Sequence, residues 1–183
     1  MSGKNNIAVI VGSIRRASLN MKLAGAIAKI AKGTLNLHVV DLNGLPLYND
    51  DLWEAPPRAV TAFKEELGRA DGFLFIAPEH NRSVTAVTKN AVDWGSRPWG
   101  QNSWANKPAA IAGTSTSLLG TAVAQSHLRS SLVVLSSVLM GQPELYISFK
   151  PGLIDESCEV ADPKLRELLA GFVERFSAFV NSF

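Results

Sequence analysis

The chain has 183 residues, of which 46% are hydrophobic and 19% are charged, and its formal net charge is +2. A length slightly above the roughly 150 residues of one domain predicts a single domain covering residues 1–183. The composition excludes a disordered chain, and the even charge balance favours neither nucleic-acid binding nor binding to a membrane surface. Because Cys158 is the only cysteine, no intrachain disulfide can form, which fits a reducing compartment.

The first residues predict neither a secretory signal nor a membrane anchor. Residues 1–6 carry one lysine, and the apolar run Ile7–Val11 is shorter than the apolar region of a signal peptide. No apolar stretch of the sequence approaches the roughly 20 residues that cross a bilayer. The sequence therefore predicts a cytoplasmic protein without membrane insertion.

Short apolar runs alternate along the chain with segments in which apolar residues recur every three or four positions, so strands and helices are predicted to alternate. In chain order, the predicted elements are a strand over residues 7–11, a helix over 21–31, a strand over 35–40, a long loop over 41–55, a helix over 56–70, a strand over 73–77, a helix over 83–96, a strand over 109–112, a helix over 120–140, a strand over 144–148 and a helix over 162–181. Ser83 and Asp162 are the predicted N-caps of the third and last helices. Five strands alternating with five helices predict an α/β fold, a three-layer sandwich with a five-stranded parallel sheet and right-handed crossovers.

Three polar loops are the places where we expect a ligand. They follow the first, third and fourth predicted strands and span Gly12–Asn20, Pro78–Ser83 and Gly113–Gly120. In open parallel sheets, ligands bind outside the carboxyl ends of the strands, at the point where the strand order reverses. We therefore expect these loops to line one site.

The first loop has the residues of an anion site. Gly12 allows a sharp turn from a strand into a helix whose first N–H groups are free to bind an anion. Arg15 adds a planar cation suited to phosphate, and short hydrogen-bonding side chains come from Ser13, Ser18 and Asn20. The sequence has neither a Walker A motif nor Gly-x-Gly-x-x-Gly. The loop therefore predicts a phosphate monoester site, and the alternative is a polar turn whose serines only cap the helix.

The other two loops are less specific. In Pro78–Ser83, the backbone amides and Asn81 offer hydrogen-bond partners to a heterocycle, while a lone His80 is more often structural than catalytic. In Gly113–Gly120, small hydroxyl residues suit the close approach of a flat ligand, and the alternative is an ordinary strand-to-helix turn. A hydrolase is disfavoured because Ser117 stands where a nucleophile elbow needs glycine.

Neither the histidines nor the cysteine predicts a metal site. His38, His80 and His127 are too scattered for a local metal-ligand motif, and Cys158 has no cysteine partner. The predicted helix over 120–140 is apolar nearly all round, which predicts burial within the domain or against a partner. From this pattern we expect a homodimer.

Together, these segments resemble the NADPH-dependent FMN reductase family, in particular its quinone and chromate reductase branch. The resemblance covers residues 5–150 and rests on Gly12–Arg15 with Ser18 and Asn20, Leu45–Tyr48 with Asp50 and Asp51, Pro78–Val84, and Lys89–Trp94. The chain departs from the family pattern at His80, where tyrosine is usual, and at Thr85-Ala86, which replaces Pro-Gly.

The resemblance implies a flavodoxin-like fold that binds FMN non-covalently. The FMN phosphate would be held by Ser13, Arg15, Ser18 and Asn20, and by the backbone of Met21 and Lys22. The isoalloxazine ring and ribityl chain would be lined by Pro78, Glu79, His80, Asn81 and Arg82, and the ring would be approached by Ser115. The family also implies dimers or dimers of dimers, with flavin sites near the subunit boundary.

The resemblance further implies a redox enzyme in which bound FMN carries the chemistry and no side chain is a nucleophile. NADPH or NADH would reduce the flavin and leave, after which a quinone, free flavin, azo dye or chromate would take the electrons in a ping-pong cycle. The alternative is a non-enzymatic electron carrier or redox sensor. We disfavour it because flavodoxin-like carriers are usually strongly acidic, whereas this chain carries a net charge of +2.

Overall fold

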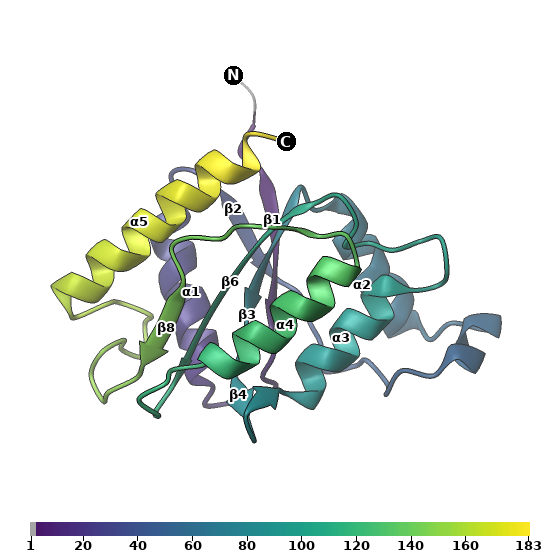
Figure 1. The fold of residues 1–183 in the computed structure, drawn as a ribbon, viewed down its shortest axis with the longest axis horizontal. Coiled ribbons are helices and arrows are strands. Elements are labelled where there is room, and N and C mark those ends of the chain that lie inside the picture. The colour runs from purple at the N-terminus through teal and green to yellow at the C-terminus, as the bar shows by residue number, and fades with distance from the viewer. Residues whose placement is uncertain (1–2) are drawn as a thin grey trace.

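A parallel β-sheet lies at the centre of the computed structural model, which describes residues 3–183 (Figure 1). Its strands are β1 (Asn6–Val11), β2 (Asn36–Val39), β3 (Gly72–Ile76), β6 (Pro108–Ser115), β7 (Val138–Leu139) and β8 (Leu145–Ser148). The order is β2-β1-β3-β6, both β7 and β8 pair with β6 at the far edge, and every pairing is parallel. The predicted α/β fold is confirmed, and the strand order reverses between β1 and β3.

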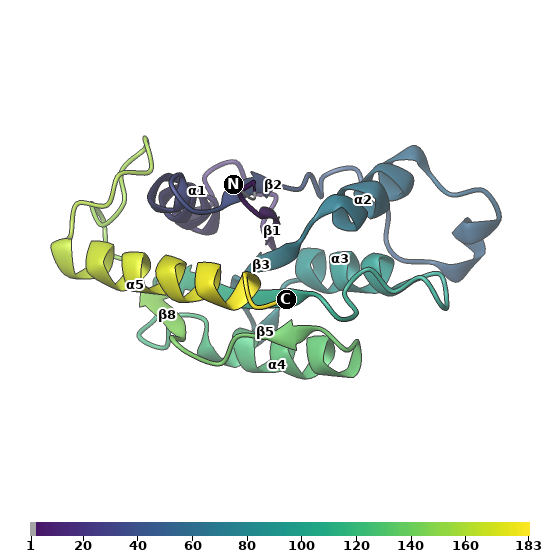
Figure 2. The same ribbon diagram turned by 90° about the horizontal axis from the view of Figure 1, so that it is seen from above.

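Helices cover both faces of this sheet (Figure 2). One face carries α1 (Leu19–Ala31) and α5 (Pro163–Val180), and the other carries α2 (Arg58–Arg69), preceded by the 3₁₀ helix η1 (Asp50–Glu54), α3 (Ala86–Ser96) and α4 (Ala122–Val134). Alternate residues of β1 belong to opposite cores, with Ile7 and Val9 toward α1 and Ala8 and Ile10 toward α2. Burial on both faces therefore explains the continuous apolar run. Among the described residues, no helix has the length and apolar character needed to cross a bilayer.

The helix predicted over residues 120–140 is shorter than expected. α4 ends at Val134, and Val138–Leu139 form the strand β7. Ser136 has a positive φ of 59°, and its N–H and that of the next residue bond back to the last turn of α4 as a Schellman motif. The predicted end is wrong because a serine, not the usual glycine, adopts the left-handed conformation. Within this chain α4 is not buried all round, since Val133 and Val134 are 64% and 79% exposed, and burial against a partner stays a prediction.

The fifth position of the sheet is split between β7 and β8. Side chains of α4 bond the carbonyl groups on both sides of the gap: Gln125 Nε2 donates to Leu145 O at 2.7 Å, and Arg129 Nη1 donates to Met140 O at 3.2 Å. These bonds satisfy backbone groups beside the break in the strand. The sheet thus keeps the predicted five positions, although the fifth holds two short strands.

The helix predicted over residues 83–96 begins three residues later. α3 starts at Ala86, and its N-cap is Thr85, whose Oγ1 accepts the Thr88 N–H at 3.1 Å. The predicted N-cap, Ser83, lies outside the helix in a short strand. The prediction is wrong because Ser83 and Thr85 are both good N-cap residues, and the pairing of Ser83 in a hairpin decides between them.

That hairpin follows β3 directly. Its strands β4 (Glu79–His80) and β5 (Ser83–Val84) pair antiparallel. The turn between them has positive φ angles at Asn81 and Arg82, 49° and 60°, which is the geometry of a two-residue type I′ turn. The predicted second loop is therefore an ordered hairpin.

The long loop over residues 41–55 is anchored to α3. Asn90 and Trp94, one turn apart, donate side-chain N–H groups to the Pro46 carbonyl at 2.9 and 2.8 Å. The Asn90 side chain also accepts the Tyr48 N–H at 2.8 Å. The two sequence motifs Leu45–Tyr48 and Lys89–Trp94, which are far apart in the chain, are therefore in direct contact.

Candidate active site

The loops that follow β1, β3 and β6 meet at the carboxyl end of the sheet, near β4 on the lower side of Figure 1. They enclose a cavity of about 320 Å³, called the cleft below. Eight of the predicted site residues line the cleft: Ser13, Arg15, Ser18, Asn20, Pro78, Glu79, His80 and Ser115. Two more, Asn81 and Arg82, line an adjoining hollow of about 360 Å³ that shares Glu79 and Ser115 with the cleft. Parallel neighbouring strands bring their carboxyl ends together, which explains why the three loops meet.

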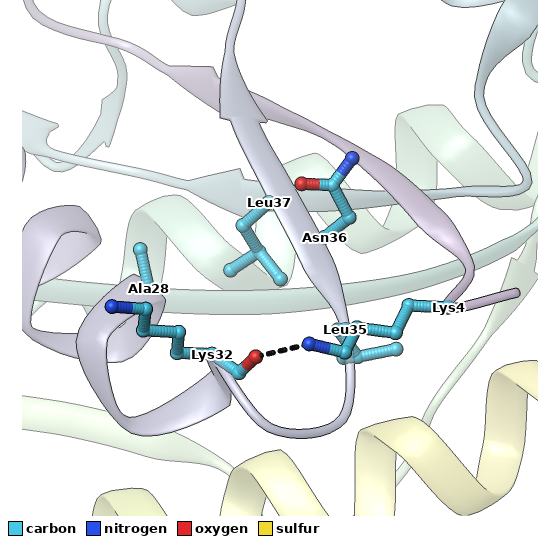
Figure 3. A pocket seen from close by; sticks show the side chains of 6 residues that line it. All are labelled: Lys4, Ala28, Lys32, Leu35, Asn36 and Leu37. Atoms are coloured by element: carbon cyan, nitrogen blue, oxygen red, sulfur yellow. Dashed lines mark hydrogen bonds between the residues drawn. The ribbon is translucent and has the colours of Figure 1, made fainter.

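A larger cavity, of about 480 Å³, lies beside the end of α1 and the amino ends of β1 and β2 (Figure 3). Its lining residues are Lys4, Ala28, Lys32, Leu35, Asn36 and Leu37. The Lys4 ammonium group already donates to the Lys32 carbonyl at the end of α1, at 2.6 Å. The lining contributes no carboxylate, imidazole or hydroxyl group. We therefore place the functional site in the cleft.

Gly12 lets the first loop lie against the start of α3. A Cβ atom at this position would overlap Thr88 Oγ1 and would lie 2.9 Å from Pro78 Cδ. The Gly12 carbonyl accepts a hydrogen bond from Thr85 Oγ1 at 2.7 Å. Only glycine allows this close approach, so the predicted role of Gly12 in turning the chain has a steric cause.

The start of α1 presents unpaired backbone donors to the cleft. Ser18 is the N-cap, and its Oγ accepts the Met21 N–H at 3.1 Å. The N–H groups of Leu19 and Asn20 have no acceptor among residues 3–183. Free N–H groups at a helix N-terminus, together with the helix dipole, form an anion site. Arg15 is exposed beside them and makes no ion pair with the described residues.

Asn20 also has a structural role that the sequence does not predict. Its side chain is almost fully buried and exchanges two hydrogen bonds with the Thr114 peptide groups, Nδ2 to the Thr114 carbonyl at 2.8 Å and the Thr114 N–H to Oδ1 at 3.0 Å. The amide therefore ties the first loop to the third. The second Nδ2 hydrogen and the backbone N–H of Asn20 have no acceptor among residues 3–183 and remain available to an anion.

The structure does not bring Met21 and Lys22 into the cleft. The backbone N–H of Met21 is used by the Ser18 cap, and that of Lys22 donates to the Ser18 carbonyl at 3.2 Å. The Lys22 ammonium group pairs with Glu156 at 2.6 Å. The backbone N–H groups of these two residues are therefore engaged within the first turn of α1.

In the hairpin, the predicted lining residues point in different directions. The Glu79 carboxylate is bonded to the first turn of α4 and to Arg82. His80 is exposed at the edge of the cleft and pairs across the hairpin with Ser83, whose Oγ lies 3.0 Å from His127 Nδ1. The hairpin therefore meets the cleft with its backbone and His80, while its acidic side chain faces α4.

The third loop is closed by its own hydrogen bonds. The Ser115 hydroxyl bonds the Gly120 carbonyl and lies 3.1 Å from Ser117 Oγ. A Cβ at Gly113 would overlap Thr121 Oγ1, and Gly120 has a φ of 55° with Tyr146 backbone against it. Neither serine is bonded to a histidine or a carboxylate within residues 3–183. The loop forms a wall of the cleft and offers no activated nucleophile.

Comparison with known proteins assigns this cleft to a family. The family model described as NADPH-dependent FMN reductase matches residues 5–152, which include all three loops. The chain belongs to this family. It is 47% identical over 175 residues to 2-hydroxy-1,4-benzoquinone reductase from a Burkholderia species, with 96% of each chain covered.

Solved structures agree with this assignment. The flavoenzyme NAD(P)H:acceptor oxidoreductase FerB from Paracoccus denitrificans matches with a TM-score of 0.94 at 42% identity, covering 97% of this chain and 98% of that one. The flavodoxin WrbA-like protein from Agrobacterium tumefaciens shares the fold, with a TM-score of 0.64 at 18% identity over 98% and 99% of the two chains. The predicted family, the flavodoxin-like fold and an oxidoreductase working with FMN are confirmed.

Four residues that shape the cleft were not singled out as site residues, although three of them lie in the predicted loops. Thr85, Thr114 and Thr116 line it, and Leu19 supplies one of its unpaired N–H groups. Thr85 carried a usable signal, because a threonine directly before an apolar helical pattern is a common N-cap. Thr114 and Thr116 belong to the small hydroxyl residues of the third predicted loop, but the bond of Thr114 to Asn20, 94 positions away, had no local signal.

Proposed function

We propose that this enzyme binds FMN in the cleft and uses it to pass electrons from NADPH or NADH to small acceptors, quinones first among them. One observation carries the proposal. The start of α1, with its unpaired N–H groups, borders the same cleft as the hairpin and the third loop. Bound FMN would supply the chemistry, because it accepts hydride from a nicotinamide and delivers electrons to an acceptor.

The start of α1 fits the phosphate end of FMN. The backbone N–H groups of Leu19 and Asn20 and the hydroxyl of Ser13 are donors of the kind that a phosphate needs, and Arg15 supplies a compensating cation. Ser18 acts indirectly, since its Oγ caps the helix that carries these donors.

The hairpin and the third loop fit the flavin ring. The turn N–H groups of Asn81 and Arg82 have no acceptor within residues 3–183, and Ser115 and Thr116 stand in the facing wall. Fixed backbone donors beside the polar edge of the ring would stabilise negative charge that develops there. No side chain of the cleft is needed as a nucleophile.

Quinones are the favoured acceptors because two of the similar proteins are named for the reduction of an acceptor. One is named for a benzoquinone substrate, and the other is titled an NAD(P)H:acceptor oxidoreductase. A single cleft means that the nicotinamide leaves before the acceptor enters, which gives ping-pong kinetics. The test is NAD(P)H oxidation with a quinone in the purified protein. Steady turnover supports the proposal, whereas oxidation that requires an added protein partner would identify an electron carrier instead.

We also propose that the protein self-associates as a homodimer or a dimer of dimers in the cytoplasm. Leu118, Leu119, Val133 and Val134 expose large apolar side chains at the two ends of α4, and such clusters favour contact with a partner. The single cysteine fits a reducing compartment. Light scattering of the purified protein should give a mass of two or four chains, and a monomeric mass at micromolar concentration would contradict the proposal.

A further inference from the structure

The first turn of α4 is capped by a residue from a different element. Thr121 occupies the N-cap position but makes no side-chain cap bond, and its Oγ1 accepts a hydrogen bond from Gln125 Nε2 at 2.9 Å. The Glu79 carboxylate, from β4, instead accepts the N–H groups of Val123 and Ala124, each at 3.1 Å. β4 lies beside this end of α4 in Figure 1. A carboxylate here both satisfies free donors and complements the helix dipole.

Both oxygens of Glu79 are engaged. Oε2 takes the two α4 bonds, and Oε1 accepts from Arg82 Nη1 at 2.9 Å. The Glu79 side chain is only 6% exposed, whereas Arg82 is 63% exposed. An ion pair with an exposed partner contributes little, so the bonds to α4 are the stronger tie. Three of the roughly four acceptor sites of the carboxylate are therefore taken up by the protein itself.

The segment that Glu79 holds is the hairpin turn. Asn81 and Arg82, the turn residues, have positive φ angles, and their N–H groups are unpaired within the described chain. They lie with Glu79 and Ser115 around the hollow that adjoins the cleft. A two-stranded hairpin is marginally stable on its own, so the position of this turn must be set from outside. A side chain that bonds the rigid start of α4 does so.

We propose that Glu79 is a positioning residue for the flavin: by capping α4 it fixes the hairpin so that the turn N–H groups of Asn81 and Arg82 meet the edge of the ring. The inference rests on the proposed function and deepens it, because it assigns Glu79 to α4 instead of to the ring lining. It depends first on the reach and acceptor capacity of the side chain, and the charge adds to it through the helix dipole.

Two variants separate reach from charge. Glu79→Gln keeps the length and an acceptor oxygen but removes the charge, whereas Glu79→Asp keeps the charge and is one methylene shorter. Titrations with FMN and with riboflavin, followed by flavin fluorescence, compare them with the wild type. Glu79→Asp should weaken both flavins equally, by about tenfold, as expected for the loss of a hydrogen bond to a charged group. Glu79→Gln should stay within about threefold, because it keeps an acceptor for the bonds to α4 and loses only the pair with an exposed arginine and the interaction with the helix dipole.

The equal loss for the two flavins is the decisive pattern. A change at the hairpin affects the ring, which FMN and riboflavin share, whereas Ser18→Ala at the other end of the cleft should weaken FMN and leave riboflavin unchanged. The inference is overturned if Glu79→Asp binds both flavins like the wild type, if it loses FMN affinity alone, or if Glu79→Gln loses as much as Glu79→Asp.

Hydrogen exchange supplies a readout that needs no flavin. The amides of Val123 and Ala124 should exchange faster in Glu79→Asp than in the wild type, and should stay protected in Glu79→Gln. Wild-type exchange rates in Glu79→Asp would overturn the inference whatever the flavin affinity. Failure of the proposed function looks different, since the wild-type protein would then bind neither flavin.

Discussion

Asn20 and Thr114 are 94 positions apart and share two buried hydrogen bonds. Through them, the loop that offers unpaired N–H groups to an anion is fixed to the last residues of β6, which border the other side of the cleft. The two sides of the proposed flavin site are therefore tied to each other. This relationship gives the first prediction.

Replacing Asn20 should cost stability as well as flavin affinity. Asn20→Ala leaves a buried carbonyl and a buried N–H of Thr114 without partners, which should lower the free energy of unfolding by about 2–4 kcal/mol. Urea unfolding measures this loss, and FMN titration should show weaker binding in the folded variant. Asn20→Ser, which retains a shorter polar group, should lose less stability. An Asn20→Ala variant as stable as the wild type would contradict the structural role.

Gly12 and Gly33 form a matched pair of glycines. A Cβ at Gly12 would overlap Thr88 Oγ1, whereas a Cβ at Gly33 would meet nothing within 4 Å. Gly12→Ala should destabilise the protein by about 1–3 kcal/mol, as overpacking does, and should weaken FMN because the first loop is displaced. Gly33→Ala should stay within about 0.5 kcal/mol of the wild type. Equal stability of the two variants would show that the first loop tolerates movement.

The contact between α3 and the long loop should depend on Asn90. Asn90→Ala removes the bonds to the Pro46 carbonyl and the Tyr48 N–H, so the amides of residues 46–54 should exchange faster and stability should fall by about 1–2 kcal/mol. Asp93→Asn is the control, because the Lys89–Asp93 pair lies on the surface and should change stability by less than about 1 kcal/mol. Unchanged exchange in Asn90→Ala would mean that Trp94 alone holds the loop.

Lys64 should make stability depend on pH in the alkaline range. Its ammonium group donates to the carbonyls of Gly95 and Gln101, and burial lowers the pKa of Lys64 from 10.5 to about 8. Between these two values the unfolded chain binds more protons, so stability should rise as pH increases from about 8 toward 10.5.

The variant Lys64→Met isolates this contribution. The difference in unfolding free energy, wild type minus variant, should increase over that window with a slope of at most about 1.4 kcal/mol per pH unit. Urea unfolding at several pH values measures it. A difference that stays flat or falls with pH would contradict a lowered pKa for Lys64.

The layers of this fold follow from local sequence, whereas its exact breaks do not. β1 and β3 are continuous apolar runs because both their faces are covered, and Asp162 caps α5 as predicted, accepting the Leu165 N–H at 2.7 Å. The end of α4 escaped prediction because Ser136 adopts a left-handed conformation that favours glycine. The start of α3 escaped it because the hairpin pairing of Ser83 is a tertiary effect.

The site, too, could be predicted only in part from local sequence. The loops could be predicted because parallel strands bring their carboxyl ends together, whereas α1 begins at Leu19, two residues before the predicted start, because Ser18 is its N-cap. The true partners of Asn20 and Glu79 could not, since Thr114 and the first turn of α4 lie far along the chain. Residue type showed which side chains are polar, and only the fold showed which of them bond the protein itself.

The most direct test of the account is a titration of flavin-free protein with FMN and riboflavin. We predict saturable binding of one FMN per chain, at least about tenfold tighter than riboflavin because the phosphate gains charge-assisted hydrogen bonds at the start of α1. Equal affinity for the two flavins, or no saturable binding of FMN, would contradict the central claim that this cleft holds the cofactor by its phosphate.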